Sequence, residues 1–177
     1  MSKHLKSGNR VIDATAGNGH DTLWLAKYVS PGGHVTAIDR QAIALAQTRS
    51  RLQSAGYLES VELIEGSHAD LIDMLPESER GEINAVVFNL GYLPGSDKHV
   101  ITQSDSTRKA LDASRCMLKS GGLLSILIYR GHPGGHEEEA MILRWIEENQ
   151  SEFDEVTWND GDHPTQDSPR LLIARRR

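Results

Sequence analysis

The chain has 177 residues, which is enough for one globular domain and short for two. Hydrophobic residues make up 38% and charged residues 25%, and no apolar run approaches the roughly 20 residues of a membrane span. The net charge of −6 argues against sequence-independent nucleic-acid binding, which depends on many phosphate contacts. Cys116 has no second cysteine to pair with, and residues 1–8 lack a signal-peptide core. We therefore expect a cytoplasmic protein with no membrane attachment.

Short apolar runs alternate with helical patterns through the first half of the chain. The turn residues at 30–33 end the first helical pattern, and Gly56 closes the second at a helix C-cap position. The fourth apolar run is almost entirely hydrophobic, as a strand buried on both faces of a sheet should be. We predict strands at 11–14, 34–39, 61–65 and 83–89, and helices at 22–29, 41–55 and 70–75.

The second half continues this alternation after a long loop at 90–105 that is rich in Gly, Pro and Ser. Gly121 and Gly122 are expected to separate a helix from the next strand, and only an irregular loop separates the last two strands, which predicts antiparallel pairing. We predict helices at 106–118 and 137–149, and strands at 123–129, 153–158 and 170–174. The pattern predicts an α/β, Rossmann-like domain over residues 1–177, with a seven-stranded, mostly parallel sheet, one antiparallel strand and helices on both faces.

A glycine-containing loop, Asp-Ala-Thr-Ala-Gly-Asn-Gly-His-Asp-Thr, begins at Asp13 after the first predicted strand. Gly17 and Gly19 let the backbone turn tightly and approach a ligand, at the edge where open α/β sheets bind ligands. Thr22 replaces the third glycine of a dinucleotide fingerprint, and no Walker sequence follows, which argues against an oxidoreductase or a triphosphate site. Asp13 and Asp21 flank the loop, where they would repel a diphosphate and favour a sulfonium or ammonium group. The loop therefore favours S-adenosylmethionine as the cofactor.

Further polar residues follow the second and third strands. An acidic residue at the position of Asp39 typically accepts hydrogen bonds from the ribose hydroxyls of an adenosine. Gln41 would border the adenine or ribose, and Ser67 and His68 follow the third strand where the base edge is read. The alternatives are a helix-start residue for Asp39 and an ordinary loop histidine for His68. These residues and the acidic loop each follow a strand of the same predicted sheet, and this shared placement favours the cofactor interpretation.

The sequence Asn-Leu-Gly-Tyr-Leu-Pro-Gly follows the fourth strand, beginning at Asn89. It resembles the Asn-Pro-Pro-Tyr element of amino-group methyltransferases, with Leu90-Gly91 in place of the two prolines. The amide of Asn89 can orient an amine through hydrogen bonds, and the ring of Tyr92 can pack against a base. We interpret Asn89 and Tyr92 as the catalytic residues, with a strand-end turn as the alternative.

Together, the glycine loop and the fourth-strand sequence resemble the YtqB/MnmM family of class I S-adenosylmethionine-dependent methyltransferases, from about Val11 to Ala174. The resemblance implies methylation of tRNA at the wobble uridine, converting the amine of 5-aminomethyl-2-thiouridine to its methylaminomethyl form. It implies tRNA as the partner, held through the anticodon region, and homodimer formation is left open. By the same resemblance, the cofactor contacts come from Asn18, His20, Asp39, Gln41, Ser67 and His68.

The expected chemistry is direct attack of a neutral amine on the sulfonium methyl, with alignment supplying most of the rate and no metal required. Candidate proton acceptors are water, a backbone carbonyl near Asn89, and His132. Residues 175–177 should point away from the active face, because the last strand is reversed. Candidate contacts to the RNA backbone are Lys98, His99, Arg108 and Arg130. The alternatives are methylation of rRNA or of another amine or amide, and a non-catalytic nucleoside-binding module.

Overall fold

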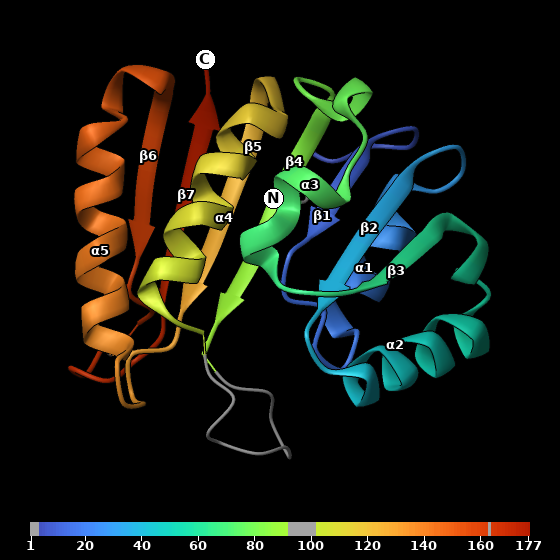
Figure 1. Cartoon of the computed structure of the whole chain (residues 1–177), viewed down its shortest axis with the longest axis horizontal. Helices are drawn as coiled ribbons and strands as arrows, with labels where there is room; N and C mark the ends of the chain where they lie inside the picture. The colour runs from blue at the N-terminus through green and yellow to red at the C-terminus, as the bar shows by residue number, and fades with distance from the viewer. Residues whose placement is uncertain (1–3, 92–101, 163) are drawn as a thin grey trace.

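In residues 4–91, 102–162 and 164–177, which the computed structural model describes, seven strands form one sheet in the order β3-β2-β1-β4-β5-β7-β6 (Figure 1). The strands are β1 (Arg10–Asp13), β2 (His34–Asp39), β3 (Val61–Glu65), β4 (Ile83–Leu90), β5 (Leu118–Ile128), β6 (Phe153–Asn159) and β7 (Arg170–Arg176). Neighbours among β1 to β5 pair in parallel, whereas β7 is antiparallel to both β5 and β6. This topology confirms the predicted fold class.

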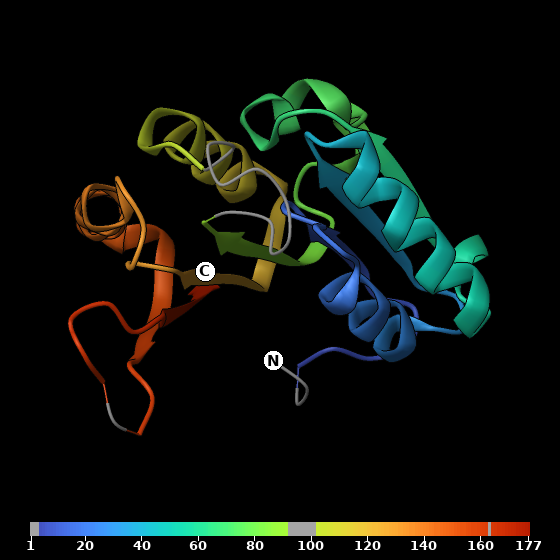
Figure 2. The same cartoon turned by 90° about the horizontal axis from the view of Figure 1, so that it is seen from below.

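Helices cover both faces of the sheet (Figure 2). The α-helices are α1 (His20–Val29), α2 (Ala42–Ala55), α3 (Leu71–Met74), α4 (Ser104–Met117) and α5 (Gly135–Glu148). Short 3-10 turns are η1 (Leu58–Ser60), η2 (His68–Asp70), η3 (Glu77–Glu79) and η4 (Gln150–Glu152). The buried residues of α1 and α2 pack in one cluster, and those of α3, α4 and α5 in another. Within the described ranges, none of these helices has the length and apolar character needed to cross a membrane.

The alternation of side chains along β4 explains why the sheet needs cover on both faces. Val86 and Phe88 pack in the α4 cluster, whereas Ala85 and Val87 pack in the α1 cluster. All four are at most 6% exposed. Burial of both faces therefore fixes the strand and aims its carboxyl end at the edge where a ligand site would form.

Two boundaries differ from the sequence prediction. β5 begins at Leu118 and passes through Gly121, which has a φ of 76°, and its register against β4 shifts between Ile83 and Ala85. The glycines therefore form an irregularity inside the strand rather than a stop before it. The predicted helix at 70–75 is instead the turn η2 followed by the short α3. The side chain of Ser67 accepts a bond from the Ala69 N–H at the start of this turn.

The direction of the strands determines which parts of the chain lie at each end of the sheet. The carboxyl ends of β1 to β5 share one edge, and the chain terminus at the end of β7 lies at the opposite edge (Figure 1). The prediction that residues 175–177 point away from the active face is therefore confirmed. Their arginines pair with acidic residues near β6, through Arg175–Glu155 at 3.3 Å, Arg176–Glu152 at 2.6 Å and Arg177–Asp154 at 2.7 Å.

Candidate functional site

A cavity of about 500 Å³ lies at the carboxyl ends of the parallel strands. It sits where the strand order reverses between β1 and β4, the position at which open α/β sheets bind ligands. One side, which we call the β2–β3 wall, contains Gly17, Asn18, Asp39, Gln41, Gly66 and His68. The opposite side, the β4–β5 wall, contains Asn89, Gly91 and Tyr129, with Asp21 of α1 beside them.

The structure brings together most of the residues predicted to form the site. Those that line the cavity are Gly17, Asn18, His20, Asp21, Asp39, Gln41, His68 and Asn89. Those that do not are Asp13, Gly19, Thr22 and Ser67. Tyr92 lies outside the described residues, so its predicted catalytic role stays a prediction.

Asp39 links the glycine loop to the start of α2. Its Oδ2 accepts a bond from the Gly17 N–H at 2.8 Å, and its Oδ1 accepts one from the Gln41 N–H at 2.9 Å. A carboxylate has about four lone-pair positions, so each oxygen can accept a further bond from a ligand. The two backbone bonds hold the carboxylate at the cavity wall in the position expected of a ribose acceptor.

Asp13 and Thr22 form a buried pair beneath the glycine loop. Asp13 is 0% exposed, and its Oδ2 accepts a bond from the Thr22 hydroxyl at 2.6 Å. Burial raises the pKa of Asp13 to about 7, with a further increase from the charge of Asp21 and an opposing decrease from the Thr22 bond. Neither residue lines the cavity, and the assignment of both to the cofactor site from the glycine-loop sequence stays a prediction. The pair ties the end of β1 to α1 and supports the loop from below.

The glycine loop is also bonded to α2, through two residues that sequence analysis did not identify. The Thr48 hydroxyl donates to the Gly17 carbonyl at 2.8 Å, and Arg51 Nε donates to the Asn18 carbonyl at 2.8 Å. Arg51 Nη2 also lies 3.1 Å from Nε2 of His20. Both side chains lie about thirty residues from the loop in sequence, so no local motif could have indicated them.

Gly19 lies behind the loop, where it permits close packing rather than ligand contact. Its φ is 78°, and an added Cβ would lie 2.7 Å from Thr48 Oγ1 and 2.8 Å from Thr48 Cα. Because one of these neighbours is backbone, the clash could not be relieved by rotating a side chain. Gly19 therefore has a packing role between α1 and α2, and its contact with the cofactor stays a prediction.

His68 is buried in the β2–β3 wall. It is 5% exposed, its ring centroid lies 6.0 Å from that of Phe88, and its Nε2 is 3.3 Å from Ser106 Oγ. Burial, followed by the charge of Arg40, lowers its pKa to about 4. His68 is therefore neutral near pH 7 and can offer a ring nitrogen to a polar ligand. Ser67, by contrast, caps η2, so its predicted cofactor contact is not supported.

Asn89 is fixed at the β4–β5 wall by both its backbone and its side chain. Its N–H donates to Thr15 Oγ1 at 2.7 Å, and its Nδ2 donates to Asp21 Oδ2 at 2.6 Å. Tyr129, which follows β5, donates its N–H to the Leu90 carbonyl at 3.0 Å. Burial and then the charge of Asp21 raise the pKa of Tyr129, so its phenol remains protonated. Sequence analysis missed Tyr129, which was placed at the end of a predicted strand.

A second cavity of about 300 Å³ meets the first at Asp21 and Asn89. Apart from these two residues and Ser125, its walls are apolar and come from α1, β4, β5 and β7, including Trp24, Leu127, Leu171 and Ile173. The hydrogen-bonded pair Asp21 and Asn89 therefore lines both cavities.

The other predicted contacts have different surroundings. His132 does not line the larger cavity, and its Nδ1 lies 3.0 Å from the Pro133 carbonyl, so the structure does not support it as a proton acceptor. Arg108 pairs with Glu148 at 2.6 Å. Lys98 and His99 lie outside the described residues. Across the described ranges, no group of three or more His, Cys, Asp or Glu side chains could hold a metal ion.

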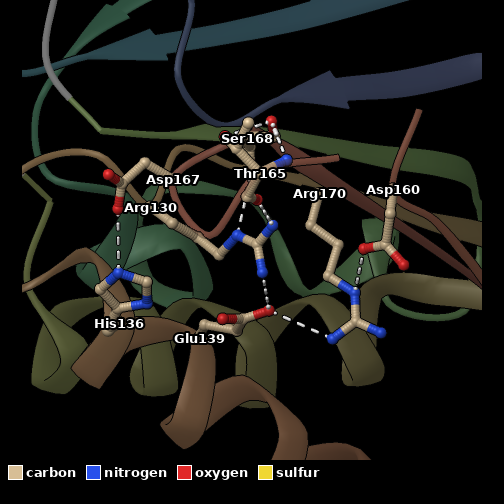
Figure 3. A network of polar contacts seen from close by, with 8 residues as sticks. All are labelled: Arg130, His136, Glu139, Asp160, Thr165, Asp167, Ser168 and Arg170. Carbon is tan, nitrogen blue, oxygen red and sulfur yellow. Dashed lines mark hydrogen bonds and ion pairs between the residues drawn. The ribbon is translucent and has the colours of Figure 1, made fainter. Parts of the chain in front are cut away.

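Arg130 belongs to a polar network that joins the segment after β5 to the β6–β7 loop (Figure 3). Its Nε donates to the Ser168 carbonyl at 2.8 Å, and its Nη1 lies 3.5 Å from Glu139 Oε1. The same oxygen lies 3.2 Å from Nη1 of Arg170, which also pairs with Asp160 at 2.7 Å. The Arg130 side chain is only 13% exposed. It is therefore a structural link, and its predicted contact with RNA is not supported.

Comparison with known sequences identifies one family and several relatives. Residues 35–174 match the model of the family described as Putative rRNA methylase. A chloroplastic tRNA (mnm(5)s(2)U34)-methyltransferase from Arabidopsis thaliana is 46% identical over 146 residues, covering 78% of this chain and 53% of the relative. Ribosomal RNA small subunit methyltransferase H 2 from Alkaliphilus metalliredigens is 36% identical over 84 residues, covering 48% of this chain and 24% of the relative. This chain thus spans about half the length of the plant relative and a quarter of the bacterial one.

Among the solved structures that match almost the whole chain, two share 32% identity with it. A proposed rRNA methylase from Clostridium thermocellum has a TM-score of 0.91 at 32% identity. A proposed methyltransferase from Streptococcus mutans, solved in complex with SAH, has a TM-score of 0.85 at 32% identity. Each match covers 99% of this chain and 92% of the other.

Replacing Gly19 by alanine is expected to destabilise the protein by roughly 1–3 kcal/mol more than replacing Gly56, because only Gly19 is crowded by α2. Gly56→Ala is a matched control, since its φ of 77° gives the same backbone strain in open space. Urea denaturation of both variants measures the difference. Equal losses of stability would contradict the packing role of Gly19.

Asp13→Asn is expected to remove a pH-dependent part of the unfolding free energy. Because the folded-state pKa of Asp13 is raised from 3.8 to about 7, its contribution to stability is fully present below about pH 4 and is lost as the pH rises through 7. At about 1.4 kcal/mol per pKa unit, the wild type should lose a few kcal/mol relative to the variant over this range. Urea denaturation from pH 4 to pH 8 tests this, with Asp73→Asn at an exposed position in α3 as the control. Parallel pH curves for wild type and Asp13→Asn would show the buried carboxyl to be ionised throughout.

Proposed function

Because the chain belongs to the family described as Putative rRNA methylase, we propose that it is an S-adenosylmethionine-dependent RNA methyltransferase. The observation that carries this proposal is that one cavity has Asp39 on one wall and Asn89 on the other. The first residue suits a ribose and the second suits a group that receives a methyl. The structure from Streptococcus mutans, which contains SAH and covers 99% of this chain, supports the same cofactor.

The residues of the β2–β3 wall fit the adenosine part of this cofactor. Asp39 is already oriented by two backbone bonds, and the neutral ring of His68 lies near the expected position of the base. Asp21 lies on the other side of the cavity, bonded to Asn89 of the β4–β5 wall. The bound cofactor would supply an electrophilic methyl group on its sulfonium. The protein supplies orientation, through the glycine loop that Thr48 and Arg51 hold in place.

The proposed acceptor is the 5-aminomethyl group of 5-aminomethyl-2-thiouridine at the wobble position of tRNA. Two observations support it: the name of the Arabidopsis thaliana relative at 46% identity, and an amide at Asn89 that can orient an amine. Methylation of rRNA is the second candidate, supported by the relative from Alkaliphilus metalliredigens over 48% of this chain. The comparisons give no support for a homodimer, and none is proposed.

A cytoplasmic location remains a prediction from the sequence, and the plant relative is named as chloroplastic. The proposed chemistry is the same in either compartment, because it needs only the cofactor and the RNA. We therefore propose a substrate for this protein and do not propose the cellular compartment in which it acts.

Methyl transfer to tRNA carrying 5-aminomethyl-2-thiouridine tests the function directly. With labelled S-adenosylmethionine, we expect label in this tRNA and no label in the same tRNA lacking the aminomethyl group, because Asn89 would have no amine to orient. Purified rRNA serves as the competing substrate. Transfer to rRNA but not to the aminomethyl tRNA would contradict the wobble assignment and favour the second candidate.

Asp39→Ala is expected to weaken cofactor binding by roughly 10- to 100-fold, as loss of charged hydrogen bonds typically costs about 1.5–3 kcal/mol. The variant loses the proposed ribose acceptor and also releases the Gly17 and Gln41 amides. Calorimetry with S-adenosylmethionine measures the effect, and Asp73→Ala in α3 is the control. Unchanged binding by Asp39→Ala would place the cofactor elsewhere, whereas no binding by the wild type would support a non-catalytic module.

A further inference from the structure

Asp21 and Asn89 come from different elements and meet at the cavity. Asp21 lies in the first turn of α1, and Asn89 is the penultimate residue of β4. The 2.6 Å bond from Asn89 Nδ2 to Asp21 Oδ2 fixes the plane of the amide and determines which way its oxygen points. Asp21 itself is exposed and lines the cavity, so its carboxylate is accessible to a ligand.

The position of Asp21 associates it with the β4–β5 wall rather than with the adenosine side. Asp39, Thr48 and Arg51 hold the loop from the side of β2 and α2, whereas Asp21 is bonded across to β4. Asp21 and Asn89 also line the second, largely apolar cavity. The pair can therefore be approached from a side that the larger cavity does not occupy.

We propose that Asp21 is a specificity-determining residue, which selects an acceptor whose reacting group is a cationic aliphatic amine. The inference rests on the proposed methyltransferase function and replaces the predicted role of Asp21 as a cofactor contact. An aliphatic amine is cationic near neutral pH, whereas the amino group of a nucleobase or a carboxamide is neutral. A carboxylate beside the reacting nitrogen attracts the first kind of acceptor and gives no such advantage to the second.

The proposed step balances without a protein base. The ammonium group loses one proton to solvent water beside the exposed Asp21 side chain. The resulting amine then donates its two N–H groups to Asp21 and to Asn89 Oδ1. This leaves its lone pair directed at the methyl carbon. The N–C bond forms as the C–S bond breaks, the electron pair stays on sulfur, and the product is a secondary ammonium ion.

Other charged and titratable groups surround Asp21 in the described structure. They are Asp13 beneath the loop, Asp39 at the end of β2, Arg40 next to Asp39 at the cavity, His20 on α1, Arg51 bonded to His20, and Tyr129 after β5. Arg51 is committed to the Asn18 carbonyl, and Arg40 lines the cavity beside Asp39. The preference for a cation therefore rests on the Asp21 carboxylate itself and not on an excess of negative charge around it.

Asp21→Asn tests the proposal, because asparagine is nearly the same shape and can still accept the bond from Asn89. With aminomethyl tRNA, we expect KM to rise at least about 10-fold, as loss of a charged partner typically does. Removing the carboxylate should also lower the pKa of the bound amine, so the pH of half-maximal kcat should fall by about one unit or more. Binding of S-adenosylmethionine, measured by calorimetry, should stay within about twofold of the wild type.

Two further variants complete the test. Asp21→Glu keeps the charge and should retain the wild-type pH profile, even where altered geometry lowers kcat. Asp73→Asn, exposed in α3, controls for loss of a surface charge and should match the wild type in all three measurements. Thermal unfolding verifies that each variant is folded.

The outcomes separate this inference from the proposed function. An active wild type with unchanged KM and pH profile in Asp21→Asn would overturn the role of Asp21 and leave the function intact. Cofactor binding weakened by much more than twofold in Asp21→Asn, with the wild-type pH profile retained at saturating cofactor, would return Asp21 to the cofactor site. A wild type that methylates a neutral nucleobase amine and not the aminomethyl tRNA would overturn both this inference and the wobble assignment.

Discussion

The site depends on the fixation of the glycine loop between β1 and the helices that flank it. The Asp39 carboxylate accepts the Gly17 N–H, and Thr48 and Arg51 donate to the Gly17 and Asn18 carbonyls. From below, the Asp13–Thr22 bond ties the end of β1 to α1. A loop held from these directions has little freedom left to lose when a ligand binds, which reduces the entropic cost of binding.

This arrangement explains why the local motif was recognisable and yet misread in part. The spacing of Asp13, Gly17 and Asp39 follows from strand and turn geometry, so the sequence predicted the position of the loop and its edge of the sheet. Whether a side chain faces the ligand or the interior depends on its neighbours in the folded chain, some within the motif and others distant in sequence. Asp13 and Gly19 were assigned to the ligand because the motif does not reveal Thr22 as a partner or Thr48 as a neighbour.

The fold itself was largely predictable, because nearly every strand is an apolar run ended by turn residues, and β2 and β3 were predicted to the residue. The main departure, at Gly121, shows the limit of that approach. Glycine permits a left-handed conformation both in a turn that ends a strand and in an irregularity within one. Pairing with β4 decides between the two, and pairing is a tertiary property. The β4–β5 wall was likewise only half predicted, since Asn89 belongs to a motif and Tyr129 does not.

The network around Glu139 has a consequence for how RNA would associate with this face. Arg130 and Arg170 share the Glu139 carboxylate, and Arg170 also pairs with Asp160, so two carboxylates balance the charges of the two arginines within the protein. A cation that is neutralised internally holds few mobile counterions and releases few when a phosphate approaches. These two arginines would therefore add little to the ionic-strength dependence of affinity for the proposed RNA substrate.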